Sequence, residues 1–204
     1  MQLEQQETFT IHGPQLEVLG RVESKLPPPA RKRPVAALGV GGGRLRALHD
    51  STARIYSAAQ DEYGHGIQSD LADQTDAAAS LIRVAGGVLG EQDADVQAAR
   101  QALDAWNETA DPDRPAVQYE RNNTLAGAVE VLYTAASDEA DARAKGQLQD
   151  LHDAFTSAQA TIERAAAEYN SKVESYNATV SAFPANVLAG LWGAGPLEAF
   201  APAG

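Results

Sequence analysis

The chain has 204 residues, 44% of them hydrophobic and 22% charged, which suits one globular domain with appendages and excludes a largely disordered chain. The absence of cysteine excludes disulfides, thiolate metal sites and cysteine nucleophiles, and 6% aromatic residues with abundant alanine favour packed helices over a sheet sandwich. The formal net charge is −12, and residues 47–204 carry nine Lys/Arg against 24 Asp/Glu, so we expect this part to repel nucleic acid.

Residues 1–43 are expected to form a flexible arm rich in proline, glycine and basic residues. Pro27 to Pro29 favour a polyproline conformation, and the glycines at 39 and 41–43 argue against any helix before Arg44. A solvated charge run is our preferred interpretation of the basic cluster, and the alternative is weak contact with anionic lipid headgroups. The basic cluster consists of Arg31, Lys32 and Arg33.

Residues 44–183 are expected to form an all-α domain, an antiparallel bundle of about four long helices. Apolar residues recur at helical spacing from 44 to about 88, with glycines at 64 and 66 that weaken this first helix, and again at 92–107 and 117–137. The last helix is the best defined, because apolar or aromatic residues recur every seven positions, as in a coiled coil. These residues are Leu148, Phe155, Ile162, Tyr169, Tyr176 and Phe183.

Two asparagines, Asn170 and Asn177, each follow a tyrosine of this seven-residue stripe. An amide at the edge of such a stripe can hydrogen-bond to a neighbouring helix and fix the helix register, which is the interpretation we favour. The alternative is a binding surface made of the tyrosine hydroxyls and the amides.

Residues 184–204 form an apolar tail that contains Leu191, Trp192 and Phe200 among glycines and prolines. Pro184 is expected to end the preceding helix. The tail is too apolar to remain in water and too short to cross a bilayer. We therefore expect it to pack on the bundle or to dock on a partner.

Glu62 and His65 are the strongest metal-ligand candidates, because positions i and i+3 share one helix face and di-iron carboxylate bundles use this pair. The sequence has no second Glu-x-x-His, so a solvated kink beside Gly64 and Gly66 is favoured over a metal site. Three aspartates, at 70, 73 and 76, could receive a cation or a basic partner, although a solvated helix face is the ordinary interpretation. No catalytic residue and no cofactor is predicted.

The end of the last helix carries a recognisable motif. Tyr169-Asn170-x-x-Val173-x-x-Tyr176-Asn177, then Phe183-Pro184-x-Asn186-x-x-Ala189 and an apolar tail ending near Phe200, resembles the C-terminal signature of the LemA family of bacterial proteins. The similarity covers roughly residues 45–200. The resemblance implies a bundle of long antiparallel helices. It carries over no functional residues, since the family has no established catalytic activity or active site.

The chain departs from the family at its N-terminus. Family members typically begin with one transmembrane helix before the bundle, whereas this chain has the basic arm there. No run reaches the ~20 apolar residues that a spanning helix needs, and the first ten residues lack the features of a secretory signal. We expect a protein of the bacterial cytoplasm or one peripheral to the cell membrane.

The sequence therefore predicts a non-catalytic interaction or scaffold protein that docks to a protein or a membrane-associated assembly through its tail, its arm, or both. A homo-oligomer is compatible with the sequence. The alternative is a metal-binding four-helix-bundle protein or enzyme using Glu62 and His65. The candidate interaction and structural residues are Tyr169, Asn170, Tyr176, Asn177, Phe183, Pro184, Asn186, Leu191, Trp192 and Phe200.

Overall fold

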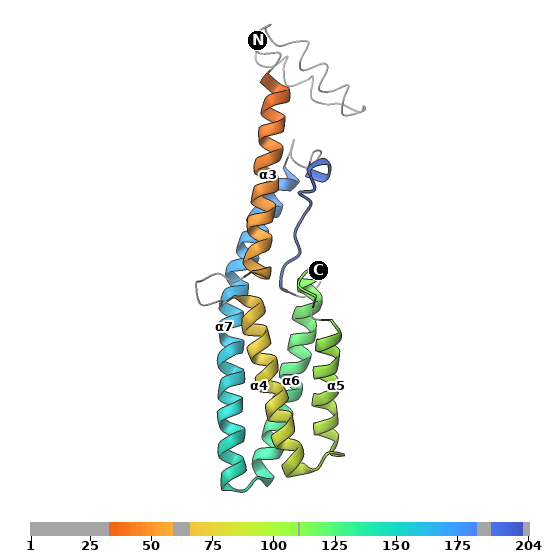
Figure 1. Ribbon diagram of the computed structural model, residues 1–204, viewed down its shortest axis with the longest axis vertical. Helices are drawn as coiled ribbons and strands as arrows, with labels where there is room; N and C mark the ends of the chain where they lie inside the picture. The colour runs from red at the N-terminus through yellow and green to blue at the C-terminus, as the bar shows by residue number, and fades with distance from the viewer. Residues whose placement is uncertain (1–32, 59–65, 110, 183–188, 202–204) are drawn as a thin grey trace. The chain divides into compact units, whose positions relative to one another are not determined.

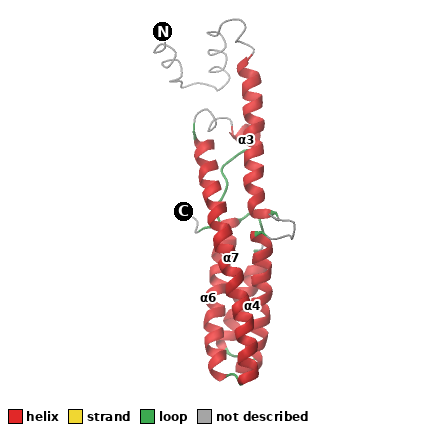
Figure 2. Cartoon of the chain, turned by 90° about the vertical axis from the view of Figure 1, so that its left-hand side faces the viewer, coloured by secondary structure: helices red, strands yellow, loops and turns green. Residues whose placement is uncertain are grey.

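The computed structural model describes residues 33–58, 66–109, 111–182 and 189–201, and in these ranges every regular element is a helix (Figure 2). This confirms the all-α prediction, and the described part of the chain contains five α-helices where about four were expected. The elements are α3 (Arg33–Ser57), α4 (Ile67–Leu89), α5 (Ala94–Glu108), α6 (Pro115–Glu139), α7 (Ala142–Ser181) and the 3-10 turn η2 (Ala189–Trp192).

The chain divides into two compact units. The first contains residues 1–50 and 177–196, and the second contains residues 51–176 and 197–204. Among the described helices, none combines the length and the apolar character needed to cross a membrane.

The second unit is a helical bundle in which α4, α5 and α6 pack pairwise and α7 shares their core (Figure 1). Short connections, such as residues 90–93 between α4 and α5, reverse the chain direction between consecutive helices. Tyr133 of α6 also stacks on His152 of α7, with ring centroids 3.9 Å apart.

The seven-residue stripe of α7 faces the core, as the sequence predicts. Burying each of its large side chains contributes about 1.5–3 kcal/mol. This is enough for the stripe to orient a helix of 40 residues whose other faces are mostly polar. The described members of the stripe are at most 2% exposed: Leu148, Phe155, Ile162, Tyr169 and Tyr176.

Local capping explains where α4 and α5 end and begin. Asp93 accepts hydrogen bonds from the backbone N–H of Asp95 at 2.9 Å and of Val96 at 3.4 Å, and so caps α5. Gly90 ends α4 with a φ of 99°, which is a conformation that favours glycine.

The structure corrects the predicted start of the first helix. α3 begins at Arg33, not at Arg44, so residues 33–43, expected in the arm, belong to a helix. Glycines lower helix propensity by about 1 kcal/mol each, but tertiary packing overrides such preferences. Gly42 shows the reason, because it is buried against the indole ring of Trp192.

The predicted continuous helix over residues 44–88 is also wrong. α3 ends at Ser57 and α4 begins at Ile67. At the start of α4, the Ser69 hydroxyl donates to the carbonyl of Gly66 and accepts from its N–H, both at 2.8 Å. Gly66 therefore starts a new helix where a weakened helix interior was predicted.

Candidate interaction site in the C-terminal segment

The Tyr169–Asn170 pair of α7 holds the main chain of the C-terminal segment. The Tyr169 hydroxyl donates a hydrogen bond to the carbonyl of Glu198 at 2.7 Å. The Asn170 amide donates to the carbonyl of Phe200 at 3.0 Å and accepts from its backbone N–H at 2.8 Å. The prediction that Asn170 bonds to a neighbouring helix is therefore corrected: the partner is an extended segment that follows α7 in sequence.

The Phe200 side chain enters a group of three tyrosine rings, which we call the aromatic socket: Tyr56, Tyr119 and Tyr169. Phe200 is only 4% exposed, and its ring lies 5.7 Å from that of Tyr56. The ring of Tyr119 meets it edge-on at 5.4 Å, a favourable geometry for an aromatic pair. Phe200, a residue of the tail, is therefore part of the buried core of the bundle.

A buried polar network lies next to the socket. The Tyr56 hydroxyl donates to the side-chain carbonyl of Gln118, which also accepts a hydrogen bond from the Gln68 amide at 3.0 Å. Burial raises the pKa of Tyr56, and it raises the pKa of Tyr169 to about 12, with a smaller contribution from the charge of Glu198. Both hydroxyls are therefore hydrogen-bond donors at neutral pH.

Glu198 gives the tail a second side-chain contact. Its carboxylate accepts a hydrogen bond from the backbone N–H of Ala116 at 3.3 Å, in the first turn of α6. Arg114, the N-cap residue of α6, makes no side-chain capping hydrogen bond to this helix. A carboxylate at a helix N-terminus satisfies a free N–H and interacts favourably with the helix dipole.

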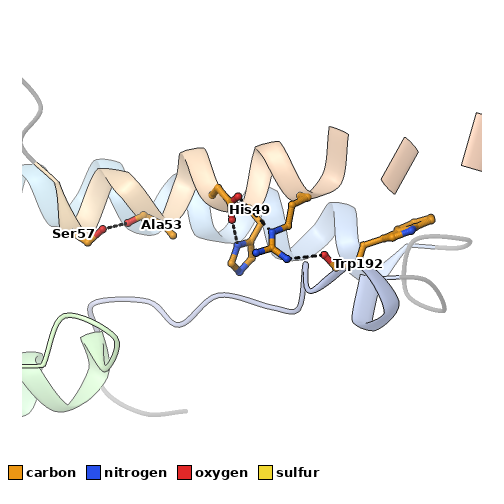
Figure 3. Close-up of polar contacts among 6 residues, drawn as sticks. His49, Ala53, Ser57 and Trp192 are labelled. Atoms are coloured by element: carbon orange, nitrogen blue, oxygen red, sulfur yellow. Dashed lines mark hydrogen bonds and ion pairs between the residues drawn. The ribbon is translucent and has the colours of Figure 1, made fainter. Parts of the chain in front are cut away.

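In the first unit, the turn η2 is fixed against α3 (Figure 3). The Arg46 guanidinium donates to the carbonyl of Trp192 at 3.2 Å and pairs with Asp50 at 3.4 Å. A hydrogen bond with His49 lowers the pKa of Asp50, and Arg46 lowers it further. Gly42 allows close contact with the Trp192 indole, since a Cβ there would overlap the ring.

The same turn exposes an apolar side chain to solvent. Ala189 and Ala194 are buried on either side of it, and the Ala194 N–H donates to the carbonyl of Ala189 at 2.9 Å. Gly193 has a φ of 61°, which closes the turn in a conformation that favours glycine. Leu191, which lies between Ala189 and Ala194, is 73% exposed, more than any other described large hydrophobic residue.

A groove of about 270 Å³ lies among α4, α5 and α6 in the second unit. Its only charged lining residue is Asp76, so the groove favours a cation or a hydrogen-bond donor over an anion. Of the other two predicted aspartates, Asp70 is buried and Asp73 is exposed, and neither lines the groove. Its remaining lining residues are Gln68, Leu71, Ala72, Thr75, Trp106, Asn107 and Gln118.

The remaining residues that the sequence predicts as sites either lie on α7 or lie outside the described residues. Tyr176 is buried in α7 and Asn177 is half-buried beside it. In the part of the chain that the structure describes, no cluster of His, Asp and Glu could hold a metal ion. Outside the described residues lie Arg31, Lys32, Glu62, His65, Phe183, Pro184 and Asn186.

Comparison with known proteins gives one match. The LemA family model matches residues 64–203, more than half of the chain. No curated protein and no solved structure matches the chain. The matched range contains both the Tyr169–Asn170 pair and the segment that this pair holds. The chain belongs to the LemA family, whose biochemical function is unknown.

Proposed function

We propose that this protein is a non-catalytic interaction protein that binds a protein of a membrane-associated assembly through the turn η2. Membership of the LemA family is compatible with this role, because the family is not known as an enzyme family. The observation that carries the proposal is the exposure of Leu191, at 73%, on a turn whose flanking residues are anchored.

Anchoring matters because binding normally costs the entropy of ordering the contact residues. Arg46 and Gly42 fix Trp192, and the buried Ala189 and Ala194 fix the two ends of the turn. Leu191 therefore projects from a backbone that is already ordered. An apolar side chain presented in this way supports a binding contact better than one on a flexible chain end.

The test is site-specific photo-crosslinking in cells of the source organism. A photoreactive amino acid at position 191 should give a discrete adduct with a protein recovered in the membrane fraction. Position 131 is the matched control, because Val131 is also an exposed apolar residue, 56% exposed, but lies on α6.

Leu191→Asp should abolish co-purification of the crosslinked protein, whereas Val131→Asp should leave it unchanged. Equal adducts from both positions, or a partner that survives Leu191→Asp, would contradict the proposal. The fold should tolerate both variants because both side chains are mainly in solvent.

A further inference from the structure

The groove among α4, α5 and α6 combines an apolar floor with a single carboxylate. We propose that this groove is a binding site for a small aromatic monoamine, whose ammonium group pairs with Asp76 and whose ring packs on Leu71 and Trp106. Every residue that lines the groove belongs to the second unit. The inference is independent of the proposed role of Leu191, which lies in the first unit.

The floor of the groove is held in place by the core. Leu71 and Trp106 line the groove but are only 1% and 4% exposed, so most of each side chain is packed inside the bundle. Thr75 is also fixed, because its hydroxyl donates to the carbonyl of Leu71 at 2.7 Å. A ligand therefore meets an apolar surface that needs little ordering on binding, which lowers the entropic cost.

Two glutamines form a polar wall at the start of α4 and α6. The Gln68 amide donates to the side-chain carbonyl of Gln118 at 3.0 Å, and the Gln118 amide donates to the Gln68 carbonyl at 3.4 Å. The Tyr56 hydroxyl also donates to the Gln118 carbonyl. Because these side chains already pair with one another, the charged group of a ligand is better accommodated at the other end of the groove.

Asp76 marks that other end and is the only charged residue of the lining. It follows Gln68 by eight positions on α4, which corresponds to about 12 Å along the helix axis. Among the residues that the structure describes, none forms a hydrogen bond or an ion pair with its carboxylate. Residues 47–204 carry nine Lys/Arg against 24 Asp/Glu, so the field of this part of the chain also attracts cations.

The lining selects an organic cation over a metal ion. Ca²⁺ and Mg²⁺ require several oxygen ligands, and no cluster of His, Asp and Glu in the described ranges could hold a metal ion. An ammonium group needs only a few acceptors. Asn107, an exposed residue of the same lining, offers an amide oxygen in addition to the Asp76 carboxylate.

The shape and charge of the groove also limit the rest of the ligand. A polyamine would place a second charge on the apolar floor, where the loss of hydration is costly. An aromatic ring instead packs favourably on the Trp106 indole. The volume of about 270 Å³ lies just below the range typical of drug-sized ligands, so the groove suits a small monoamine.

Phenethylamine is the probe for this site, and NMR of the full-length protein is the measurement. The protein has two tryptophans, so two indole N–H signals appear. Phenethylamine should shift the Trp106 signal saturably, with a dissociation constant on the order of a millimolar for so small a ligand. The Trp192 signal should stay in place, because Trp192 lies in the first unit.

Asp76→Asn should weaken binding about fivefold, as expected for the loss of an exposed ion pair. Asp73→Asn is the matched control, since it makes the same change of charge on the same helix at an exposed residue that does not line the groove. It should leave the dissociation constant unchanged. Equal weakening in both variants would reveal non-specific attraction to the acidic chain and would overturn the proposal.

Two further ligands separate the charge from the ring. Phenethyl alcohol keeps the ring but is neutral, and it should bind about fivefold more weakly than phenethylamine. Butylamine keeps the charge on a chain like that of a lysine side chain, and it should also bind more weakly. Equal binding of butylamine would identify a site for lysine side chains instead, and a Trp106 signal that does not saturate with phenethylamine would equally refute the proposal.

Discussion

Asn170 of α7 exchanges two hydrogen bonds, of 3.0 and 2.8 Å, with the main chain of Phe200, 30 residues later in the sequence. Tyr169 and Asn170 form the first Tyr-Asn pair of the LemA signature, and both side chains hydrogen-bond to the main chain of the C-terminal segment. The pair holds the main chain of residues 198 and 200 against α7.

Asn170→Ala should release the segment around Phe200. Loss of two hydrogen bonds costs about 2 kcal/mol, which corresponds to an increase of about 30-fold in the population of the open segment. Hydrogen exchange at the amides of residues 198–200 measures this change. Ser171→Ala is the control, since Ser171 is exposed on the same helix, and equal exchange in both variants would contradict the assignment.

The tyrosine in this contact predicts a pH dependence. The pKa of Tyr169 is raised from 10.0 to about 12, so the stability that its protonated hydroxyl contributes is complete below pH 10 and is lost as pH rises through about 12. In this interval the free energy of unfolding should fall by up to about 1.4 kcal/mol per pH unit through this group alone. Urea unfolding of wild type and Tyr169→Phe measures it, and identical slopes would refute the prediction.

Gln74→Met should stabilise the protein. The Gln74 side chain is fully buried in α4, and among the residues that the structure describes neither its amide nitrogen nor its oxygen has a hydrogen-bond partner. Removing a buried unpaired amide while conserving its volume gains about 1–3 kcal/mol. Urea unfolding provides the measurement.

Gln118→Met is the matched control for Gln74→Met. Gln118 is equally buried, but its amide accepts hydrogen bonds from Tyr56 and Gln68, so the same substitution should destabilise the fold there. A gain in stability at both positions would show that hydrogen bonding does not explain the difference.

Gly42→Ala should displace Trp192 from α3. The added Cβ would overlap the indole ring, whereas a Cβ at Gly43 has nothing within 4 Å. Gly43→Ala should instead stabilise the helix by up to about 1 kcal/mol through its higher helix propensity. The protein has two tryptophans, so two indole N–H signals appear by NMR, and only the Trp192 signal should shift strongly in Gly42→Ala. An unmoved signal would contradict the contact.

Several features of this protein follow from the sequence by itself. The seven-residue spacing from Leu148 to Tyr176 predicts a long helix and its buried face, and the structure places these side chains in the core. Periodicity is a local property, because every residue of the stripe lies on one helix whatever packs against it. The same holds for the LemA signature, which is recognisable in the last helix and the tail.

Only the tertiary structure determines which distant residues the last helix and the tail contact. The partner of Asn170 is Phe200, and the Phe200 ring meets Tyr56, a residue far earlier in the chain, so no local pattern could indicate the aromatic socket. The glycines before Arg44 predict an arm, yet α3 begins at Arg33 and Gly42 contacts Trp192. The physical reason is the same in both cases: contacts between distant segments supply free energies that exceed local backbone preferences.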